Sequence, residues 1–549
     1  MNNQDVELVR EIMADQEAMK TERTAFEAQW NEVIEIMLPR YRRFGQGYEQ
    51  PGQKNTSKIF DATPALAHRH MSAAMDSMIT PRTQKYQRLV ASDPATKQSD
   101  AVKAYLEQTG DIQFSMRYKW RAQFASAINE VYGNQVAFGA GGVMVEDTGD
   151  RRNPLRYRQI RLADLFYTEG ESGLVDKAHM RWCLTVRQAA QRWGRAALPP
   201  SMQLQLDRNP EQKYTFLHAV RPRRERDPRK VDGRNMAFQS VWILEQGKEI
   251  IEHGGFRTFP VAIGRLAVAD GSQYAYGPAM DALPDIKMLN DMERTNIRAA
   301  QKVVDPPLLL PEDGALEGFD LRSGALNYGG ISDRGDQMVR PLELGKNVPL
   351  GVDYAQQKRE SINLAFYVTL FQIMVENPQM TATEVLQRQQ EKGFLLAPTM
   401  GRVQSEMLGS LTTRELDILG SYVGLLPDMP QEIYQAEGEV DIEYDSPLNR
   451  AMRTEEGTAV LRWMEASAPF FSLDPRAAKV VNAVESVRGL ADTFGVPTRF
   501  VNPDDVTKQQ IAAEEEQAQA AAMLEAAPIA AGAAKDLSQA QATAQSAQL

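Results

Sequence analysis

The stretch "YGPAMDALPDIKMLNDMERTNIRAAQKVVDPP" (276–307) decides how the chain is organised. Its apolar residues recur at helical spacing and predict a helix from 279 to 304, which "DPP" ends because proline cannot continue a helix. A helix of this length spans about 39 Å. Residues 305–346 are rich in Gly and Pro and indicate a small β-type insert, and a second helix follows to about residue 373. The sequence therefore predicts a unit of helix, β insert and helix.

One face of the first of these helices is predicted to be cationic. At 100° per residue, an arc of about 80° collects four basic residues and one acid: Lys287, Arg294, Arg298 and Lys302, with Asp291 among them. The opposite arc is apolar. Taken alone, this cationic stripe is most simply an ordinary solvated face, in which Asp291 forms helix ion pairs. That interpretation changes if the helix faces something negatively charged.

The flanking regions predict an α+β fold. The first forty residues read as an amphipathic helix that ends at Pro39, with Trp30 and Met37 on its apolar face. A second helix begins near residue 63, with Thr63 as N-cap and Pro64 at the first helical position. From about Val136 to 270, short apolar runs separated by Gly, Pro and Asp indicate strands packed on helices.

The segment "ENPQMTATEVLQRQQEK" (376–392) predicts a short loop between two helices. Asn377-Pro378 favours a turn, because proline disfavours a helical residue before it. Thr381 and Glu384 have the spacing of a capping box that begins the next helix. Gly393 interrupts that helix.

Composition excludes several classes of protein. The apolar fraction of 43% in 549 residues excludes a wholly disordered chain, and 62 Lys and Arg against 73 Asp and Glu exclude a globally basic nucleic-acid binder. The single Cys183 excludes an intramolecular disulfide framework and indicates a reducing compartment. No apolar run reaches membrane-spanning length, and the charged opening stretch is not a signal peptide.

No catalytic motif stands out, so we expect neither an active site nor a metal or cofactor site. G-x-S-x-G, H-E-x-x-H and the phosphate-binding loop are all missing from the sequence. His68 and His70 point about 200° apart on a helix, which favours structural histidines. The glycine-rich "GAGGV" (139–143) predicts a hairpin turn, and the basic run 221–230 is more simply a solvated loop than a nucleic-acid patch.

Four stretches together resemble a known family. They are 276–307, "NPQMTATEVLQR" (377–388), "YDSPLNRAMR" (444–453) and "KIFDATPALA" (58–67). In this order and spacing they resemble the head-to-tail connector (portal) proteins of T7-like short-tailed bacteriophages. The resemblance extends to about residue 500 and leaves the Ala/Gln-rich tail unmatched.

The resemblance implies a ring-forming portal fold with an α/β wing, a two-helix stem, a small β-type clip and a helical crown. The resemblance assigns residues 1–278 to the wing, 279–304 and 347–373 to the two stem helices, and 305–346 to the clip between them. It assigns 374–381 to a tunnel loop and 382–470 to a long interrupted helix and the return of the chain to the wing. The remaining ranges are 471–511 for the crown helices and 512–549 for the Ala/Gln-rich C-terminal tail.

In function, the resemblance implies a dodecameric ring at one capsid vertex, a channel for double-stranded DNA during genome packaging and ejection. Implied partners are DNA without sequence specificity, the terminase large subunit, major capsid and scaffolding proteins, and tail adaptor proteins. The protein is expected in the virion, and in the host cytoplasm during assembly, with no enzymatic activity of its own. The cationic stripe would line the channel and guide the DNA by attracting its charged phosphate backbone, without reading the bases.

The same resemblance assigns 374–381 as the tunnel loop at the narrowest part of the channel. Its residues are Glu376, Asn377, Pro378, Gln379, Met380 and Thr381. They are not strongly basic, which suits passage of DNA better than a clamp. Gly393 is the candidate hinge about which the loop would move.

Two alternatives come from other classes. A phage enzyme, such as a terminase or nuclease, would need the phosphate loop or carboxylate motif that the sequence lacks. A ring-forming tail or adaptor protein would lack the unit of helix, insert and helix at 279–373.

Overall fold

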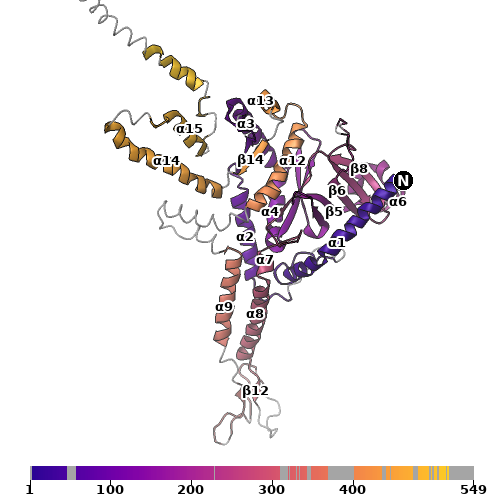
Figure 1. Ribbon diagram of the computed structural model, residues 1–549. Helices are drawn as coiled ribbons and strands as arrows, with labels where there is room; N and C mark the ends of the chain where they lie inside the picture. Colours follow the sequence, from indigo (N-terminus) through magenta and orange to yellow (C-terminus); the bar gives the residue numbers. More distant parts are fainter. Residues whose placement is uncertain are drawn as a thin grey trace, which may run out of the picture. The chain divides into compact units, whose positions relative to one another are not determined.

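The computed structural model describes most of the chain (Figure 1). The described residues are 3–45, 57–94, 96–227, 229–230, 232–309, 320, 322–328, 330–332, 334–342, 348–368, 401–435, 440–444, 447–473, 480–493, 496, 500–503, 506–514 and 516–518.

The chain divides into two compact units. The first comprises Met1–Tyr86, Ile112–Leu426 and Tyr444–Leu448. The second comprises Gln87–Asp111, Pro427–Glu443 and Asn449–Leu549. Helices and strands occur in both, so the predicted α+β class is confirmed.

The larger sheet of the first unit is a five-stranded antiparallel meander in the order β4-β5-β6-β7-β8. Its strands are Leu165–Glu169, Val175–Thr185, Lys213–Pro222, Phe238–Leu244 and Glu249–Phe256. Successive side chains of a strand point to opposite faces. Leu217 of β6 therefore packs under Ile12 of helix α1 (Asn3–Met37), whereas its neighbour Phe216 packs with Met202 on the other face.

That second face is covered by two short helices inserted between β5 and β6. They are α5 (Val186–Trp193) and α6 (Pro200–Arg208), joined by a 3-10 turn at Arg195–Ala197. A capping box begins α5: the Thr185 hydroxyl accepts from the Gln188 backbone N–H, and the Gln188 side chain accepts from that of Thr185.

A three-stranded sheet in the order β3-β2-β9 lies in the main core. Its strands are Leu155–Ile160, Ala140–Asp147 and Val261–Arg265. Helix α4 (Phe124–Phe138) runs directly into β2 through Gly139, which has φ 83° and caps the helix. The predicted hairpin turn at 139–143 is therefore wrong: left-handed Gly139 ends a helix, and the next glycines lie inside a buried strand.

The main core joins α1, α4 and the three-stranded sheet to α2 (Thr63–Ile79). Trp30 and Met37 of α1 are buried in it, which confirms the predicted apolar face of that helix. Helix α2 begins at Thr63, so the predicted N-cap at this residue is one position off. The Asp61 carboxylate instead accepts from the Thr63 backbone N–H at 2.7 Å.

The predicted helix over 279–304 is divided in two. Helix α7 (Pro278–Asp281) ends at Ala282, and α8 (Leu283–Val304) begins beyond it. Pro284 at the start of α8 lacks the N–H that a continuous helix would need there. A pair of two-residue strands, β10 (Ala267–Val268) and β11 (Ala275–Tyr276), precedes α7.

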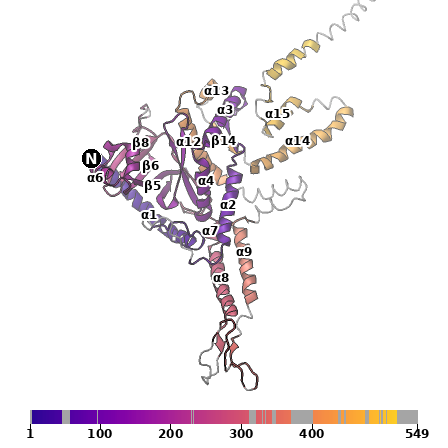
Figure 2. The same cartoon turned by 180° about the vertical axis from the view of Figure 1, so that it is seen from behind.

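Helix α9 (Val348–Ala365) runs beside α8 in both views (Figures 1 and 2). It ends before residue 373, the predicted limit, and Tyr367 just beyond it has a left-handed φ of 54°. Between the two helices, β12 (Leu308–Leu309) pairs with β13 (Arg340–Pro341) and Ile331 bridges to Gln337, so the described part of the insert carries strand pairing.

Residues 401–420 are helical, as predicted. A π-helical stretch at Gln404–Leu408 leads into α12 (Gly409–Gly420), which packs into the main core through Leu411 and Leu419.

The second unit holds a two-stranded sheet and helices. Strand β1 (Gln87–Ala91) pairs with β14 (Val440–Tyr444). The helices are a 3-10 turn at Thr96–Gln98, α3 (Asp100–Arg117), which ends in the first unit, α13 (Gln431–Gln435), α14 (Pro447–Leu473) and α15 (Ala483–Thr493). None of the described helices is long and apolar enough to cross a membrane.

Candidate functional site

The cationic stripe on α8 has two different halves. Lys287, near the start of the helix, forms an ion pair of 2.6 Å with Glu32 of α1, and the guanidinium of Arg294 lies 5.9 Å from the Phe60 ring. Arg298 and Lys302 are exposed, and neither has an ion-pair partner among the described residues. The free charge of the stripe therefore lies toward the insert end of the helix.

Two of the three acids of α8, Asp285 and Glu293, lie on another side of the helix and pair with α9, whereas Asp291 lies within the stripe. Asp285 accepts from Lys358 Nζ and from Ser361 Oγ, each at 2.8 Å. The hydrogen bond from Lys358 lowers the pKa of Asp285. Glu293 accepts from Arg359 at 2.6 Å. These pairs neutralise the side that faces α9 and leave the stripe uncompensated along its outer half.

The two helices approach closely at Gly351 of α9. Asn296 of α8 donates to the Gly351 carbonyl at 3.3 Å, and a Cβ at Gly351 would lie only 2.4 Å from the Asn296 Oδ1 atom. A side chain at position 351 would force the Asn296 side chain to move.

The segment Lys58–Asp61 clamps the base of the helix pair. The Asn290 side chain of α8 accepts from the Phe60 backbone N–H at 2.9 Å and donates to the Lys58 carbonyl at 2.8 Å. Asp61 accepts from Arg359 of α9 at 2.9 Å and caps α2 at the same time. The segment "KIFDATPALA" (58–67) therefore holds α8 and α9 together at this end. Its sequence alone does not predict that role.

Several predicted residues lie outside the described part of the chain. These are the whole tunnel loop, Glu376, Asn377, Pro378, Gln379, Met380 and Thr381, and the hinge candidate Gly393. Their assignments stay predictions.

The basic run at 221–230 is partly tied into the fold. Arg221 pairs with Glu11 at 2.9 Å and lies 3.7 Å from Asp15, both on α1. Arg223 donates to the backbone carbonyls of Met236, Gly233 and Gly254. These two arginines hold the end of β6 in place.

The histidines of α2 differ in environment. His68 is buried, its Nε2 atom lies 2.8 Å from the Gly133 carbonyl oxygen, and burial lowers its pKa, whereas His70 is exposed. Within the described residues, no group of three or more His, Cys, Asp or Glu side chains is placed to hold a metal ion.

Comparison with known proteins gives one family. The model described as "Bacteriophage head to tail connecting protein" matches residues 9–501. The chain is 27% identical over 514 residues to the "Probable portal protein" of Bordetella phage BPP-1, covering 92% of this chain and 91% of that protein. It is 24% identical over 530 residues to the "Portal protein" of Salmonella phage epsilon15, covering 95% and 94% of the two chains.

Solved structures give weaker similarity. A chain from "Neck of empty GTA particle computed with C6 symmetry" has a TM-score of 0.37 at 11% identity, covering 79% of this chain and 89% of that one. A chain from "Virion of native gene transfer agent (GTA) particle" has a TM-score of 0.36 at 10% identity, covering 74% and 84%.

Proposed function

The chain belongs to the bacteriophage head to tail connecting proteins, the portal proteins, and from this premise we propose how its parts serve that role. Twelve copies form a ring at one capsid vertex, and double-stranded DNA passes through its channel during packaging and ejection. The α8–α9 pair is the stem, the insert between them the clip, and residues 374–381 the tunnel loop. Gly393 is the hinge of that loop.

The observation that carries this proposal is the division of charge on α8. Asp285 and Glu293 pair with Lys358 and Arg359 of α9, whereas Arg298 and Lys302 are exposed and have no ion-pair partner among the described residues. In a ring, each exposed cation is repeated in every subunit and forms a cationic ring around the axis. Phosphate backbone is attracted to such rings without base recognition, which suits a channel that must pass any sequence.

The proposal includes partners of the assembled ring. These are the terminase large subunit, which drives the DNA, the major capsid and scaffolding proteins, and the tail adaptor proteins. The ring has no catalytic role of its own and belongs to the portal vertex of the virion, after assembly in the host cytoplasm. The names of the two relatives support a portal over the alternative of a tail or adaptor protein.

Electron microscopy of the purified full chain with rotational averaging tests the proposal. We expect a hollow ring with twelvefold symmetry and α8 lining its lumen. A monomer or a solid particle at micromolar concentration would contradict ring formation. A ring with α8 on its outer wall would contradict the channel assignment of the cationic stripe.

A further inference from the structure

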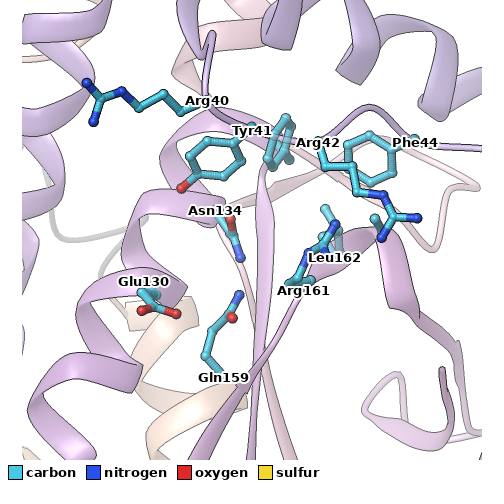
Figure 3. A pocket seen from close by; sticks show the side chains of 11 residues that line it. Arg40, Tyr41, Arg42, Phe44, Glu130, Asn134, Gln159, Arg161 and Leu162 are labelled. Atoms are coloured by element: carbon cyan, nitrogen blue, oxygen red, sulfur yellow. The ribbon is translucent and has the colours of Figure 1, made fainter. Parts of the chain in front are cut away.

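A polar cavity of about 490 Å³ lies in the first unit (Figure 3), and none of its lining residues belongs to α8 or α9. Its walls come from the segment 40–44 that follows α1, from α4, and from residues 159–163 at the end of β3. The volume falls in the range of pockets that hold small organic ligands.

Side chains of α1 hold the walls of the cavity in place. Arg23 is buried and donates to the carbonyls of Leu162 at 3.0 Å, Leu165 at 2.8 Å and Ala163 at 3.1 Å. Asn31 accepts from the Phe44 backbone N–H at 2.8 Å, which fixes the opposite wall. The cavity is therefore preformed, so a ligand would not have to order its walls on binding.

Polar side chains converge on this cavity. Asn134 of α4 is only 4% exposed, points into the cavity, and forms no side-chain hydrogen bond within the described part of the chain (Figure 3). Gln159 and Arg161 point toward it from the facing wall (Figure 3). An amide that lines a cavity without a protein partner keeps its two donors and its acceptor available to a bound molecule.

The charged and aromatic side chains that line the cavity indicate which chemical class of molecule it would bind. Arg42 and Arg161 supply guanidinium groups, which bind phosphate through paired hydrogen bonds, and Arg161 also forms a loose ion pair of 3.8 Å with Asp164. The Arg40 guanidinium points away from the other polar side chains (Figure 3). Tyr41 is 40% exposed, so its ring can accept a stacked base. Glu130 lies apart from Arg42 and Arg161, toward Tyr41, where its carboxylate can accept from an exocyclic amino group (Figure 3).

We propose that this cavity binds a nucleotide, with the phosphate at Arg161 and Arg42 and the base on Tyr41, its edge facing Asn134, Gln159 and Glu130. A purely acidic peptide fits less well, because Glu130 would repel a second carboxylate. The nucleotide can be free or an unpaired residue of a DNA strand, since both present the same phosphate and base. None of the residues of the stripe on α8 lines this cavity.

Isothermal titration calorimetry on the purified full chain tests this, with dAMP, dCMP, dTMP, inorganic phosphate and a single-stranded oligonucleotide as separate probes. We expect dAMP and dCMP to bind more tightly than dTMP, which lacks an exocyclic amino group, and more tightly than phosphate alone. Arg161→Gln and Tyr41→Ala should each weaken dAMP binding at least tenfold. Arg121→Gln, an exposed arginine that does not line the cavity, is the matched control and should leave binding unchanged.

Thermal unfolding of each variant separates loss of binding from loss of fold. If dAMP binds and the oligonucleotide does not compete with it, the natural ligand is a free nucleotide. If the oligonucleotide binds more tightly than dAMP and loses affinity in Arg161→Gln, the ligand is an unpaired nucleotide of a DNA strand. The proposal is overturned if no nucleotide binds at millimolar concentration, or if phosphate binds as well as dAMP. It is also overturned if both cavity variants fold and bind dAMP like the parent chain.

Discussion

Arg117 of α3 and Glu415 of α12 form an ion pair whose Nη2 and Oε2 atoms lie 2.6 Å apart, with both side chains fully buried. Glu415 also accepts from Gln113 at 2.6 Å and from Tyr157, and Arg117 donates to Tyr86 at 2.5 Å. Burial opposes the charge of Arg117, but Glu415 keeps its pKa above the ordinary value. Both members of the pair are therefore charged, and each also has hydrogen-bond partners besides the other.

Glu415→Gln should destabilise the first unit by about 3–5 kcal/mol, because it leaves a buried guanidinium without its counter-charge. The double variant Arg117→Met/Glu415→Leu should lose less than the sum of its two single variants, since it removes both charges and leaves neither one buried alone. Thermal unfolding of Arg117→Met, Glu415→Leu and the double variant measures the coupling. Additive losses would show that the two residues do not act as a pair.

Gly139→Ala tests the junction between α4 and β2. The residue has φ 83°, and a Cβ there would lie 2.4 Å from the Tyr276 carbonyl carbon, so we expect a loss of more than about 3 kcal/mol or an insoluble protein. The control is Gly110→Ala in α3, where a Cβ meets nothing within 4 Å. That change should be neutral or stabilise by up to about 1 kcal/mol in thermal unfolding.

Much of the secondary structure could be predicted from local pattern. The 3.6-residue period of α1 places Trp30 and Met37 in the core, and the short apolar runs after Val136 become strands. Helical spacing also fixes which side chains share the arc of the stripe on α8. The apolar period continues through Ala282 and does not mark the division there; the local signal for it is Pro284, which lacks the N–H of a continuous helix.

The contacts that join distant segments could not be predicted. Arg117 and Glu415 are 298 residues apart, as are Asp61 and Arg359, and a single sequence carries no signal that pairs them. The polar cavity draws its walls from three separate segments, so no local motif marks it. Partner choice on the stripe is equally non-local: Lys287 and Arg298 look alike in sequence, but only Lys287 meets an acid of α1.

Because of His179, we expect the folded protein to lose stability in acid. It is buried on β5, its Nδ1 atom lies 3.1 Å from Gln16 Oε1, and burial lowers its pKa from 6.5 to about 4. Asp15 opposes this lowering, and Lys177 and Arg221 reinforce it. Below pH 6.5 the unfolded chain binds a proton that the folded chain takes up only near pH 4, so stability present above pH 6.5 is lost as the pH falls through this window.

The expected contribution of this one group is about 3 kcal/mol. His179→Asn should flatten the fall of the unfolding temperature between pH 6.5 and 4, even if it lowers stability at neutral pH. His70→Asn, on the exposed face of α2, is the matched control and should leave the parent's pH slope in place. An unchanged slope in His179→Asn would assign the acid sensitivity to other groups.

Arg359→Met should loosen the base of the helix pair. The Asp61 side chain is only 7% exposed, and Arg359 bridges it to Glu293. Removing the cation leaves a nearly buried carboxylate without its counter-charge, with the Thr63 N–H bond remaining, at a cost of about 2–3 kcal/mol. Hydrogen exchange should show faster exchange in α8 and α9 and at the start of α2. Arg208→Met, an exposed arginine at the end of α6, should leave exchange in these helices unchanged.

Charge reversal along α8 separates the two halves of the stripe. Arg298→Glu with Lys302→Glu should leave ring assembly intact and strongly reduce the DNA packaged per particle, because both side chains are exposed and without a described ion-pair partner. Lys287→Gln should have a smaller effect on packaging, since its charge is already balanced by Glu32 at 2.6 Å.

Arg294→Glu with Arg298→Glu should also impair packaging, with Arg208→Glu as the matched surface control. Rings of each variant are first checked by electron microscopy, and packaged DNA is then measured by nuclease protection at two salt concentrations. A loss caused by repulsion of phosphate should shrink at the higher salt concentration, because salt screens exposed charges. Normal packaging by rings that carry Arg298→Glu and Lys302→Glu would mean that the stripe faces protein or bulk solvent and not DNA.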